Sequence, residues 1–215
     1  MLPNINMLYS GTDFNNKTIL ITGGAGFIGS NLAFYFQKNY PDSRIVVFDC
    51  FRSEKLFNNG NLQSFGHYKN LIGFTGTIIC GNINNKNDLS LLNDYKFDYI
   101  FHQAAISDTR AHDQEIIIKT NVNSIYDLLE IAKNDQAVLV YASSAATYGS
   151  MPSPQTVGKE NPENPYGYSK YVMDQIACQY SKENPDMTIV GLRFFNVYGP
   201  REYYKAKTSS MVIQL

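Results

Sequence analysis

The segment TILITGGAGFIG, at residues 18–29, joins a short β-branched run to three spaced glycines and an apolar helical stretch. Gly23 permits a tight turn, Gly26 lets the backbone approach a pyrophosphate, and Gly29 lets the helix pack closely on the strand. Free N–H groups and the helix dipole favour an anion at the start of that helix. The segment therefore predicts a strand, a turn and a helix that together bind a dinucleotide.

An acid follows at the spacing that a dinucleotide site requires. Asp49 ends the apolar run RIVVFD, 20 residues after Gly29, and we expect its carboxylate to accept a hydrogen bond from the adenosine ribose. Alone, this acid would repel a 2′-phosphate and favour NAD. Arg52 and Lys55 follow within six residues, and either side chain could bind that phosphate. The residues alone therefore leave NAD and NADP both open.

The rest of the chain alternates between buried strands and helices. This pattern predicts a parallel sheet covered on both faces, which is a Rossmann-like, doubly wound α/β fold. Residues 50–74 are polar and are expected to form a loop with at most one short helix. The expected strands are 18–21, 44–49, 77–80, 99–102, 137–142 and 188–194, and the expected helices are 27–39, 86–94, 113–133 and 166–181.

Three regions are expected: an N-terminal extension at 1–16, a cofactor-binding domain at 17–195, and the start of a substrate-binding region at 196–215. The last stretch, from Ser209 to Leu215, begins like a helix with a serine cap but has no C-terminal signal. We expect from this that the chain is cut short and that its substrate-binding part is incomplete.

Composition excludes several classes of function. The 215 residues are 44% hydrophobic and 17% charged, with a net charge of −1, which gives no reason to expect nucleic acid or a membrane surface as a partner. The three cysteines lie far apart and the three histidines show no ligand spacing, so neither a disulfide framework nor a metal site is expected. Without a signal peptide or a membrane span, the chain is expected to be cytoplasmic.

A second motif carries the expected chemistry. Tyr166 and Lys170 are four residues apart on one face of a predicted helix. A nearby ammonium and an oxidised nicotinamide would lower the pKa of the phenol from about 10 into a useful range. Ser143 and Ser144, just after the fifth strand, are the candidate hydroxyls that polarise a substrate oxygen. A tyrosine and a lysine at this spacing also occur by chance, as Tyr203 and Lys207 do. The functional interpretation of Tyr166 and Lys170 therefore depends on the nearby serines and on the glycine loop.

Together with YASSAATYG at 141–149 and RFFNVYGPR at 193–201, these motifs resemble the extended short-chain dehydrogenase/reductase family over residues 17–215. The resemblance implies that Tyr166 is one catalytic acid/base and that Lys170 lowers its pKa and holds the nicotinamide ribose. It further implies that Ser144 is the hydroxyl partner and that Lys205 is the second acid/base.

The resemblance also implies binding residues. Asn82 stands where the family usually has an acid near the adenine. Substrate-binding positions fall on Ser144, Asn196, Lys207 and Gln214. Cofactor-binding positions, including those argued above, fall on Gly23, Gly26, Phe27, Ile28, Gly29, Asp49, Arg52, Lys55, Gln103, Ala104, Ala105, Ser107, Asn121, Lys170 and Val197.

Within the family, the pattern SSAATYG followed by RFFNVYGPRE and Lys205 is most similar to members that use NADP to invert C6 of an ADP-linked heptose for the lipopolysaccharide inner core. Inversion would pass through transient oxidation to a ketone, so a proton donor is needed on each side. A nucleotide-sugar substrate and a homo-oligomer at full length are implied. The alternatives are a 4-epimerase, a cofactor-binding fragment without turnover, or a dehydratase, against which Ala145 and Ala146 count because a dehydratase commonly has Asp-Glu there.

Overall fold

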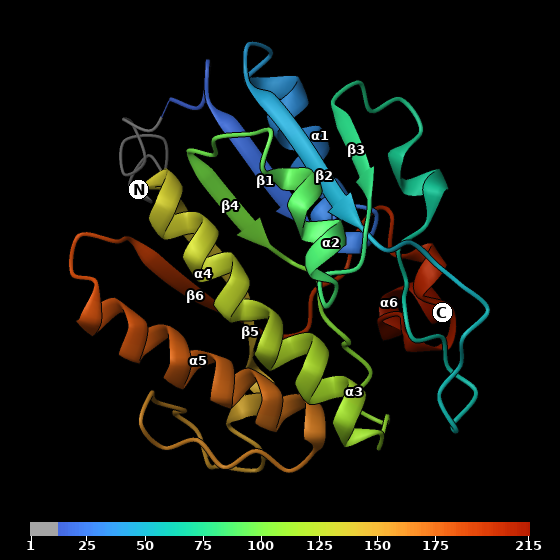
Figure 1. Cartoon of the computed structure of the whole chain (residues 1–215). Coiled ribbons are helices and arrows are strands. Elements are labelled where there is room, and N and C mark those ends of the chain that lie inside the picture. Colours follow the sequence, from blue (N-terminus) through green and yellow to red (C-terminus); the bar gives the residue numbers. More distant parts are fainter. Residues whose placement is uncertain (1–12) are drawn as a thin grey trace, which may run out of the picture.

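The computed structural model describes residues 13–215, in which the strands form one six-stranded parallel sheet of order β3-β2-β1-β4-β5-β6 (Figure 1). All five neighbouring pairs run parallel. The strands are β-branched and apolar, which suits a sheet buried on both faces. Their bounds are β1 Thr18–Thr22, β2 Arg44–Asp49, β3 Thr77–Cys80, β4 Tyr99–His102, β5 Val138–Ser144 and β6 Ile189–Phe194. The predicted Rossmann-like fold class is confirmed.

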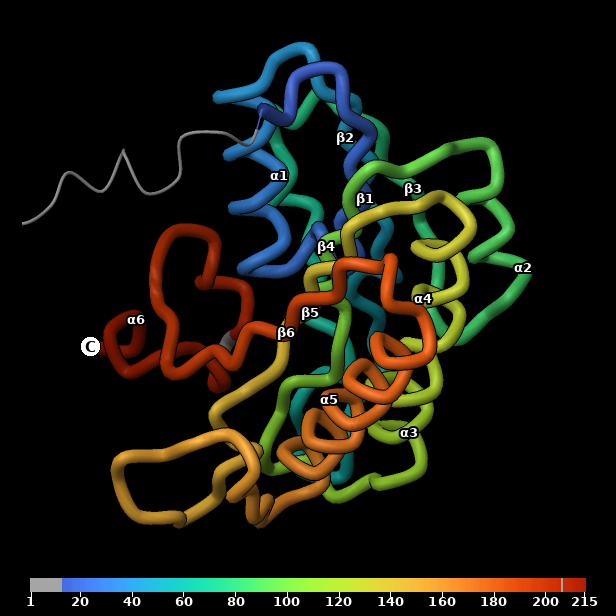
Figure 2. The backbone as a smooth tube through the Cα atoms, turned by 90° about the vertical axis from the view of Figure 1, so that its left-hand side faces the viewer, coloured from blue at the N-terminus to red at the C-terminus, as the bar shows by residue number. Residues whose placement is uncertain are grey.

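Helices cover the two faces of the sheet. Figure 2 shows α1 on one side of the strands and α4 and α5 on the other. Under α1 lies one apolar cluster that includes Ile19, Ile21 and Phe36, whereas a larger cluster lies under α4 and α5. The helices are α1 Phe27–Asn39, α2 Lys86–Leu89, α3 Gln114–Ile118, α4 Ser124–Asp135, α5 Pro165–Glu183 and α6 Met211–Gln214, with 3₁₀ turns η2 Tyr68–Leu71, η3 Ser90–Leu92, η5 Ala145–Thr147 and η6 Tyr203–Thr208.

The predicted long helix over 113–133 is interrupted. A π-helical turn, η4 (Lys119–Asn123), separates α3 from α4. Within it, the buried Asn121 accepts from the N–H of Ile106 at 2.8 Å and donates to the Ile106 carbonyl at 2.9 Å and to Ser169 Oγ at 2.9 Å. These bonds fix the wide turn against the loop after β4 and against α5, which helical periodicity does not predict.

Several other boundaries differ from the prediction. β5 extends to Ser144, so Ser143 and Ser144 are the last two strand residues rather than the first residues after it, and they face opposite sides. The predicted helix over 86–94 ends as the 3₁₀ turn η3. The last helix begins after a serine, Ser210, as expected, but the Ser210 side chain makes no capping hydrogen bond. Most of the predicted extension at 1–16 lies outside the described residues.

Candidate active site

A cavity of about 850 Å³ opens at the carboxyl ends of β1, β4 and β5. This is where the strand order reverses, since β4 lies beside β1 and away from β3. Ligands of open parallel sheets bind at such a point. Its walls come from the glycine loop, the ends of β4 and β5, the first turn of α5 and the segment after β6.

The glycine loop forms one wall and fits a dinucleotide. Gly23 has a φ of +69°, and a Cβ there would lie 2.6 Å from the backbone N of Ala104. A Cβ on Gly29 would collide with the carbonyl of Gly23. Gly26 caps α1 without a side chain, so the first-turn N–H groups face the cavity without a side-chain oxygen in front of them. Such a cradle accepts a pyrophosphate.

Asp49 lies at this wall, but its carboxylate serves the loop. Oδ2 accepts from the N–H of Ala25 at 2.9 Å and Oδ1 from that of Phe51 at 2.7 Å. Burial raises the pKa of the carboxyl, and backbone hydrogen bonds oppose the rise. The structure therefore assigns Asp49 first to holding the glycine loop, whereas the sequence predicted a contact with the adenosine ribose.

On the opposite wall, Tyr166 and Lys170 project from the first turns of α5. The helix begins with Pro165, and Asn164 caps it by accepting from the N–H of Gly167 at 2.8 Å, so its start is well defined. Lys170 is 2% exposed, and its Nζ lies 6.0 Å from the centroid of the Tyr166 ring. The pair predicted from the spacing thus faces the cavity together.

The pKa values of this pair reflect burial. Burial lowers the pKa of the Lys170 amine to about 8, and the charge of Asp174 opposes that effect. Burial raises the pKa of the Tyr166 phenol, and a hydrogen bond with Ser144 opposes the rise. The expected lowering of the Tyr166 pKa is therefore not present in the protein alone, where burial dominates, and the phenol is protonated at neutral pH.

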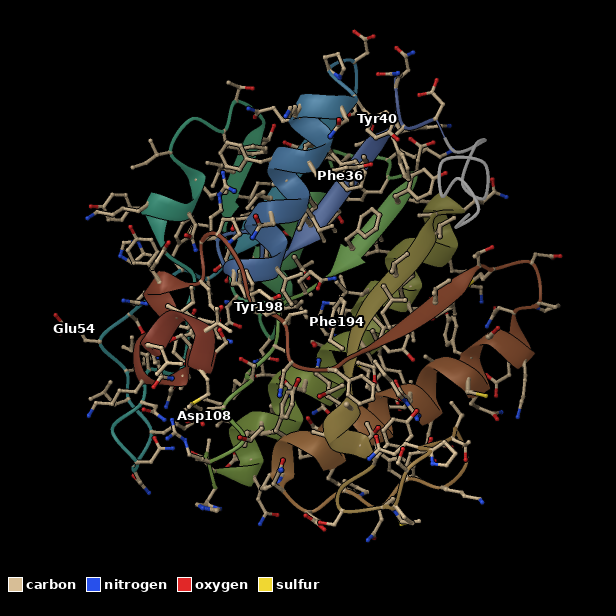
Figure 3. The ribbon with its side chains drawn as sticks, turned by 180° about the vertical axis from the view of Figure 1, so that it is seen from behind. Phe36, Tyr40, Glu54, Asp108, Phe194 and Tyr198 are labelled. Atoms are coloured by element: carbon tan, nitrogen blue, oxygen red, sulfur yellow. The ribbon has the colours of Figure 1, made fainter. Side chains whose placement is uncertain are left out.

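Lys205 reaches the same cavity from a different segment. It lies in η6, half-buried, with Nζ 5.9 Å from the centroid of the Phe27 ring. Burial lowers the pKa of its amine, and the charge of Glu202 opposes this. Glu202 is fully buried and accepts from the N–H of Ser210 at 2.6 Å and from Ser210 Oγ at 2.9 Å. Figure 3 shows the course of this segment, from Phe194 at the end of β6 past Tyr198.

Most of the other predicted residues also line the cavity. Gln103 and Ser143 both line the cavity, and among the described residues Gln103 Oε1 and Ser143 Oγ are buried atoms without a hydrogen-bond partner. The Asn82 backbone position also lies at this wall. The predicted residues on the walls are Gly23, Gly26, Phe27, Ile28, Gly29, Asp49, Gln103, Ala104, Ala105, Ser107, Ser144, Tyr166, Lys170, Asn196, Val197 and Lys205.

Five predicted residues do not line the cavity. Arg52 is partly buried and donates to the carbonyl of Tyr204, while Lys55 and Lys207 are exposed. Gln214 is exposed and donates to the carbonyl of Ser209 at 2.6 Å. Asn121 lies behind the wall and supports the Ile106 backbone.

Two groups next to Lys170 had no role in the sequence prediction. His102 is 1% exposed, and its Nδ1 lies 2.7 Å from Thr22 Oγ1. Burial lowers the pKa of its imidazole to about 3, and the charge of Lys170 adds to that effect. Asp174 lies one helical turn after Lys170, and that i, i+4 spacing was the signal that could have found it.

In the part of the chain that the structure describes, no three His, Cys, Asp or Glu side chains gather as metal ligands. Nor does any helix of residues 13–215 have the length and apolar character to cross a membrane. The fold and the cavity define a Rossmann-type protein with a glycine-rich dinucleotide cradle.

Comparison with known proteins gives the family. The model of the NAD dependent epimerase/dehydratase family matches residues 19–215. The chain belongs to this family.

Two similar proteins share one name. The chain is 36% identical over 202 residues to an ADP-L-glycero-D-manno-heptose-6-epimerase from Brachyspira hyodysenteriae, covering 92% of this chain and 60% of that protein. It superposes on the crystal structure of the Helicobacter pylori ADP-L-glycero-D-manno-heptose-6-epimerase with a TM-score of 0.87 and 53% identity, covering 96% of this chain and 64% of that chain. The chain thus spans less than two thirds of the length of both.

A more distant neighbour has bound ligands. The UDP-glucuronic acid 4-epimerase from Bacillus cereus, in complex with UDP-glucuronic acid and NAD, superposes with a TM-score of 0.72 at 29% identity. The match covers 86% of this chain and 58% of that one. A nicotinamide cofactor therefore accompanies this fold in a solved relative.

Proposed function

We propose that this chain carries the cofactor-binding domain and the acid/base groups of an NADP-dependent epimerase that inverts C6 of ADP-D-glycero-D-manno-heptose. One observation carries the proposal: Tyr166 and Lys205, from segments far apart in the sequence, line the same cavity as the glycine loop. Inversion at one carbon needs a proton donor and acceptor on each side of the sugar, and these two groups supply them. The names of the similar relatives support the choice of substrate.

The cofactor, when bound, supplies transient oxidation of the sugar carbon and its re-reduction. The chain's own residues bind and orient the reactants. The N–H groups at the start of α1 hold the pyrophosphate, and Lys170 holds the nicotinamide ribose. Ser144 and Tyr166, which line the same cavity, hold and move the proton on the sugar oxygen, and Lys205 does the same when the sugar presents its other face.

Two features support NADP over NAD. Asp49, the acid that would repel a 2′-phosphate, has both carboxylate oxygens bonded to backbone N–H groups, and burial raises the pKa of its carboxyl. Arg52 follows it, and the Nε of its guanidinium has no partner among the described residues. Although Arg52 does not line the cavity, it comes three residues after Asp49. A 2′-phosphate at this wall would therefore lie near a cation and near an acid that is already hydrogen-bonded to the backbone.

The proposed setting follows from the substrate. An ADP-linked heptose is a precursor of the lipopolysaccharide inner core, so we propose that the protein works in the cytoplasm, as a homo-oligomer when full length.

The test is a proton NMR time course of ADP-D-glycero-D-manno-heptose with the protein and NADP or NAD. We expect inversion at C6 without accumulation of NADPH, faster with NADP. Tyr166→Phe should lose activity about 10²–10⁴-fold because it removes the acid/base group. The matched control is Tyr168→Phe, a half-exposed tyrosine on the same helix, which should retain wild-type activity.

Two outcomes would contradict the proposal. No conversion by a folded chain that binds NADP would mean that these residues do not suffice for turnover. Conversion of UDP-glucuronic acid in place of the heptose would identify a 4-epimerase instead.

A further inference from the structure

Asp174 lies one helical turn after the active-site lysine on α5 and is held by hydrogen bonds and an ion pair, although it does not line the cavity. Its Oδ1 accepts from the Tyr141 hydroxyl at 3.0 Å, and its Oδ2 accepts from Arg193 Nε at 3.0 Å and Nη2 at 2.9 Å. The donors come from β5 and β6, so both neighbouring strands fix the carboxylate. Its side chain is only 11% exposed.

Arg193 is shared between two acids. Its Nη2 also lies 2.6 Å from Glu160 Oε1, and its guanidinium stacks 4.7 Å from the centroid of the Tyr148 ring. The side chains of Arg193 and Glu160 are 13% and 5% exposed. Glu160, Arg193 and Asp174 are thus joined by two ion pairs, and the buried Lys170 lies one helical turn before Asp174 on α5, so the four charges of this cluster sum to zero. Buried charges are tolerated when they are paired in this way.

Asp174 is the carboxylate, among the described residues, whose charge acts on the Lys170 amine. The neighbour of Lys170 from β4, His102, is neutral at physiological pH and brings no compensating charge. Residues four apart on a helix have side chains on the same face. The titratable and charged groups around the Lys170–Asp174 pair are Tyr166 and Cys178 from α5, His102 from β4, Tyr141 from β5, Arg193 from β6, and Tyr148 and Glu160 from the segment between β5 and α5.

We propose that Asp174 is a positioning residue that keeps the buried Lys170 amine charged and fixed near Tyr166. Arg193 sets how strongly the Asp174 carboxylate stabilises that charged amine. The consequence for catalysis rests on the proposed function, because it requires Tyr166 to be the acid/base. A charged Lys170 favours the ionised phenol of Tyr166, and a neutral one does not. Asp174 therefore acts through Lys170 and has no contact with the substrate.

The direct test is a pH titration of the protein labelled with carbon-13 at lysine Cε, followed by NMR, with Lys170→Arg to assign the signal. In Asp174→Asn we expect the pKa of Lys170 to fall by about one pH unit or more, because its counter-charge is removed. In Arg193→Gln we expect it to rise, because the Asp174 charge is then no longer shared. The control is Glu183→Gln, at the other end of α5, which should change nothing.

Shifts of the Lys170 pKa in opposite directions in the two variants distinguish an electrostatic role of Asp174 from a purely structural one. Asp174→Asn leaves Arg193 paired with Glu160, and Arg193→Gln leaves Asp174 with the Tyr141 hydroxyl, so either variant that folds tests the proposal. An unchanged Lys170 pKa in either variant, or shifts of the same sign in both, would overturn it.

The titration needs no sugar, so it separates this inference from the proposed function. If the wild-type chain converts the heptose, Asp174→Asn should also lower kcat at neutral pH more than it changes KM, and move the activity limb governed by Tyr166 to higher pH. Asp174→Glu, which keeps the charge, should restore the profile. If the wild-type chain converts no heptose, the proposed function fails while the Lys170 titration still decides the role of Asp174.

Discussion

The two lysines of the cavity are held by very different parts of the molecule. Lys170 lies in a long helix, and its acidic neighbour is fixed by residues of β5 and β6. Lys205 lies in a 3₁₀ turn whose acid, Glu202, is fixed by Ser210, eight residues further along the same segment. The position of Lys170 is therefore set when the sheet and α5 form, whereas that of Lys205 depends on how residues 195–214 dock.

That docking relies on a few contacts. Arg201 donates to Asn31 Oδ1 at 3.2 Å, and Asn31 donates to the carbonyl of Pro200 at 2.9 Å. Tyr204 stacks on His67 with ring centroids 4.0 Å apart. Contacts of this kind are individually worth about 1 kcal/mol. Changes near Lys170 should thus affect stability and activity together, and changes near Lys205 should affect activity alone.

The largest expected effect is on activity, in the second region, which is the segment of residues 195–214 that contains Lys205. Lys205→Met should lower kcat for heptose inversion about 10²–10⁴-fold, because one of the two proton donors is lost. Its melting temperature should stay at the wild-type value, since the side chain is half-buried and has no ion pair within the described residues. Steady-state kinetics and a thermal melt, with the exposed Lys133→Met as control, measure both. Full activity of Lys205→Met would remove this lysine from the mechanism.

The next effect is on stability, in the first region, which is the part of the sheet and α5 around Lys170. Arg193→Gln should lower the free energy of unfolding by about 3–5 kcal/mol, because the buried Glu160 loses its only ion-pair partner among the described residues. Arg201→Gln, the matched change in the second region, should cost less than about 1 kcal/mol. Urea unfolding at pH 7 gives both values. Equal losses for the two variants would show that the contrast between the regions is wrong.

The pH dependence of stability should also be concentrated beneath α5. The pKa of His102 is lowered from 6.5 to about 3 by burial, so below pH 6.5 the unfolded chain binds a proton that the folded chain does not. Stability is therefore lost as the pH falls, by about 2 kcal/mol between pH 6.5 and 5. Unfolding at these pH values should show a smaller loss for His102→Gln than for wild type, and an unaltered loss for the exposed His112→Gln. Identical losses in all three proteins would rule out this assignment.

The smallest expected effect concerns the docking of the second region. Tyr204→Ala removes the stack on His67, which is worth about 1 kcal/mol. We expect heptose inversion to slow by about 3- to 10-fold, with the melting temperature unchanged. Phe65→Ala, another aromatic side chain that lines the cavity, should leave the acid/base chemistry of Lys205 intact and so leave the pH profile unchanged. A Tyr204→Ala melting temperature well below wild type would mean that this segment also supports the core.

The sequence predicted the first region better than the second. Periodicity and composition located the strands, and the YxxxK spacing placed Tyr166 and Lys170 on one helix face, because helices and strands impose fixed periods. The charged cluster around Asp174 was missed because Arg193, Glu160 and Tyr141 meet only after folding. The π-helical turn around Asn121 was missed for the same reason. In the second region, Lys205 was found by resemblance, while Lys207 and Gln214 lie away from the cavity. Their placement could not be predicted, because a short 3₁₀ turn and a helix of one turn have no strong sequence period.

The central claim is that Tyr166 and Lys205 move only the proton on the sugar oxygen. It is tested most directly with ADP-D-glycero-D-manno-heptose deuterated at C6, incubated with the protein and NADP in ordinary water. We expect the inverted product to keep its deuterium at C6, because neither group takes hydrogen from carbon. Loss of that deuterium to the solvent during inversion would mean that one of them removes a proton from C6 itself, which would contradict the roles assigned to both.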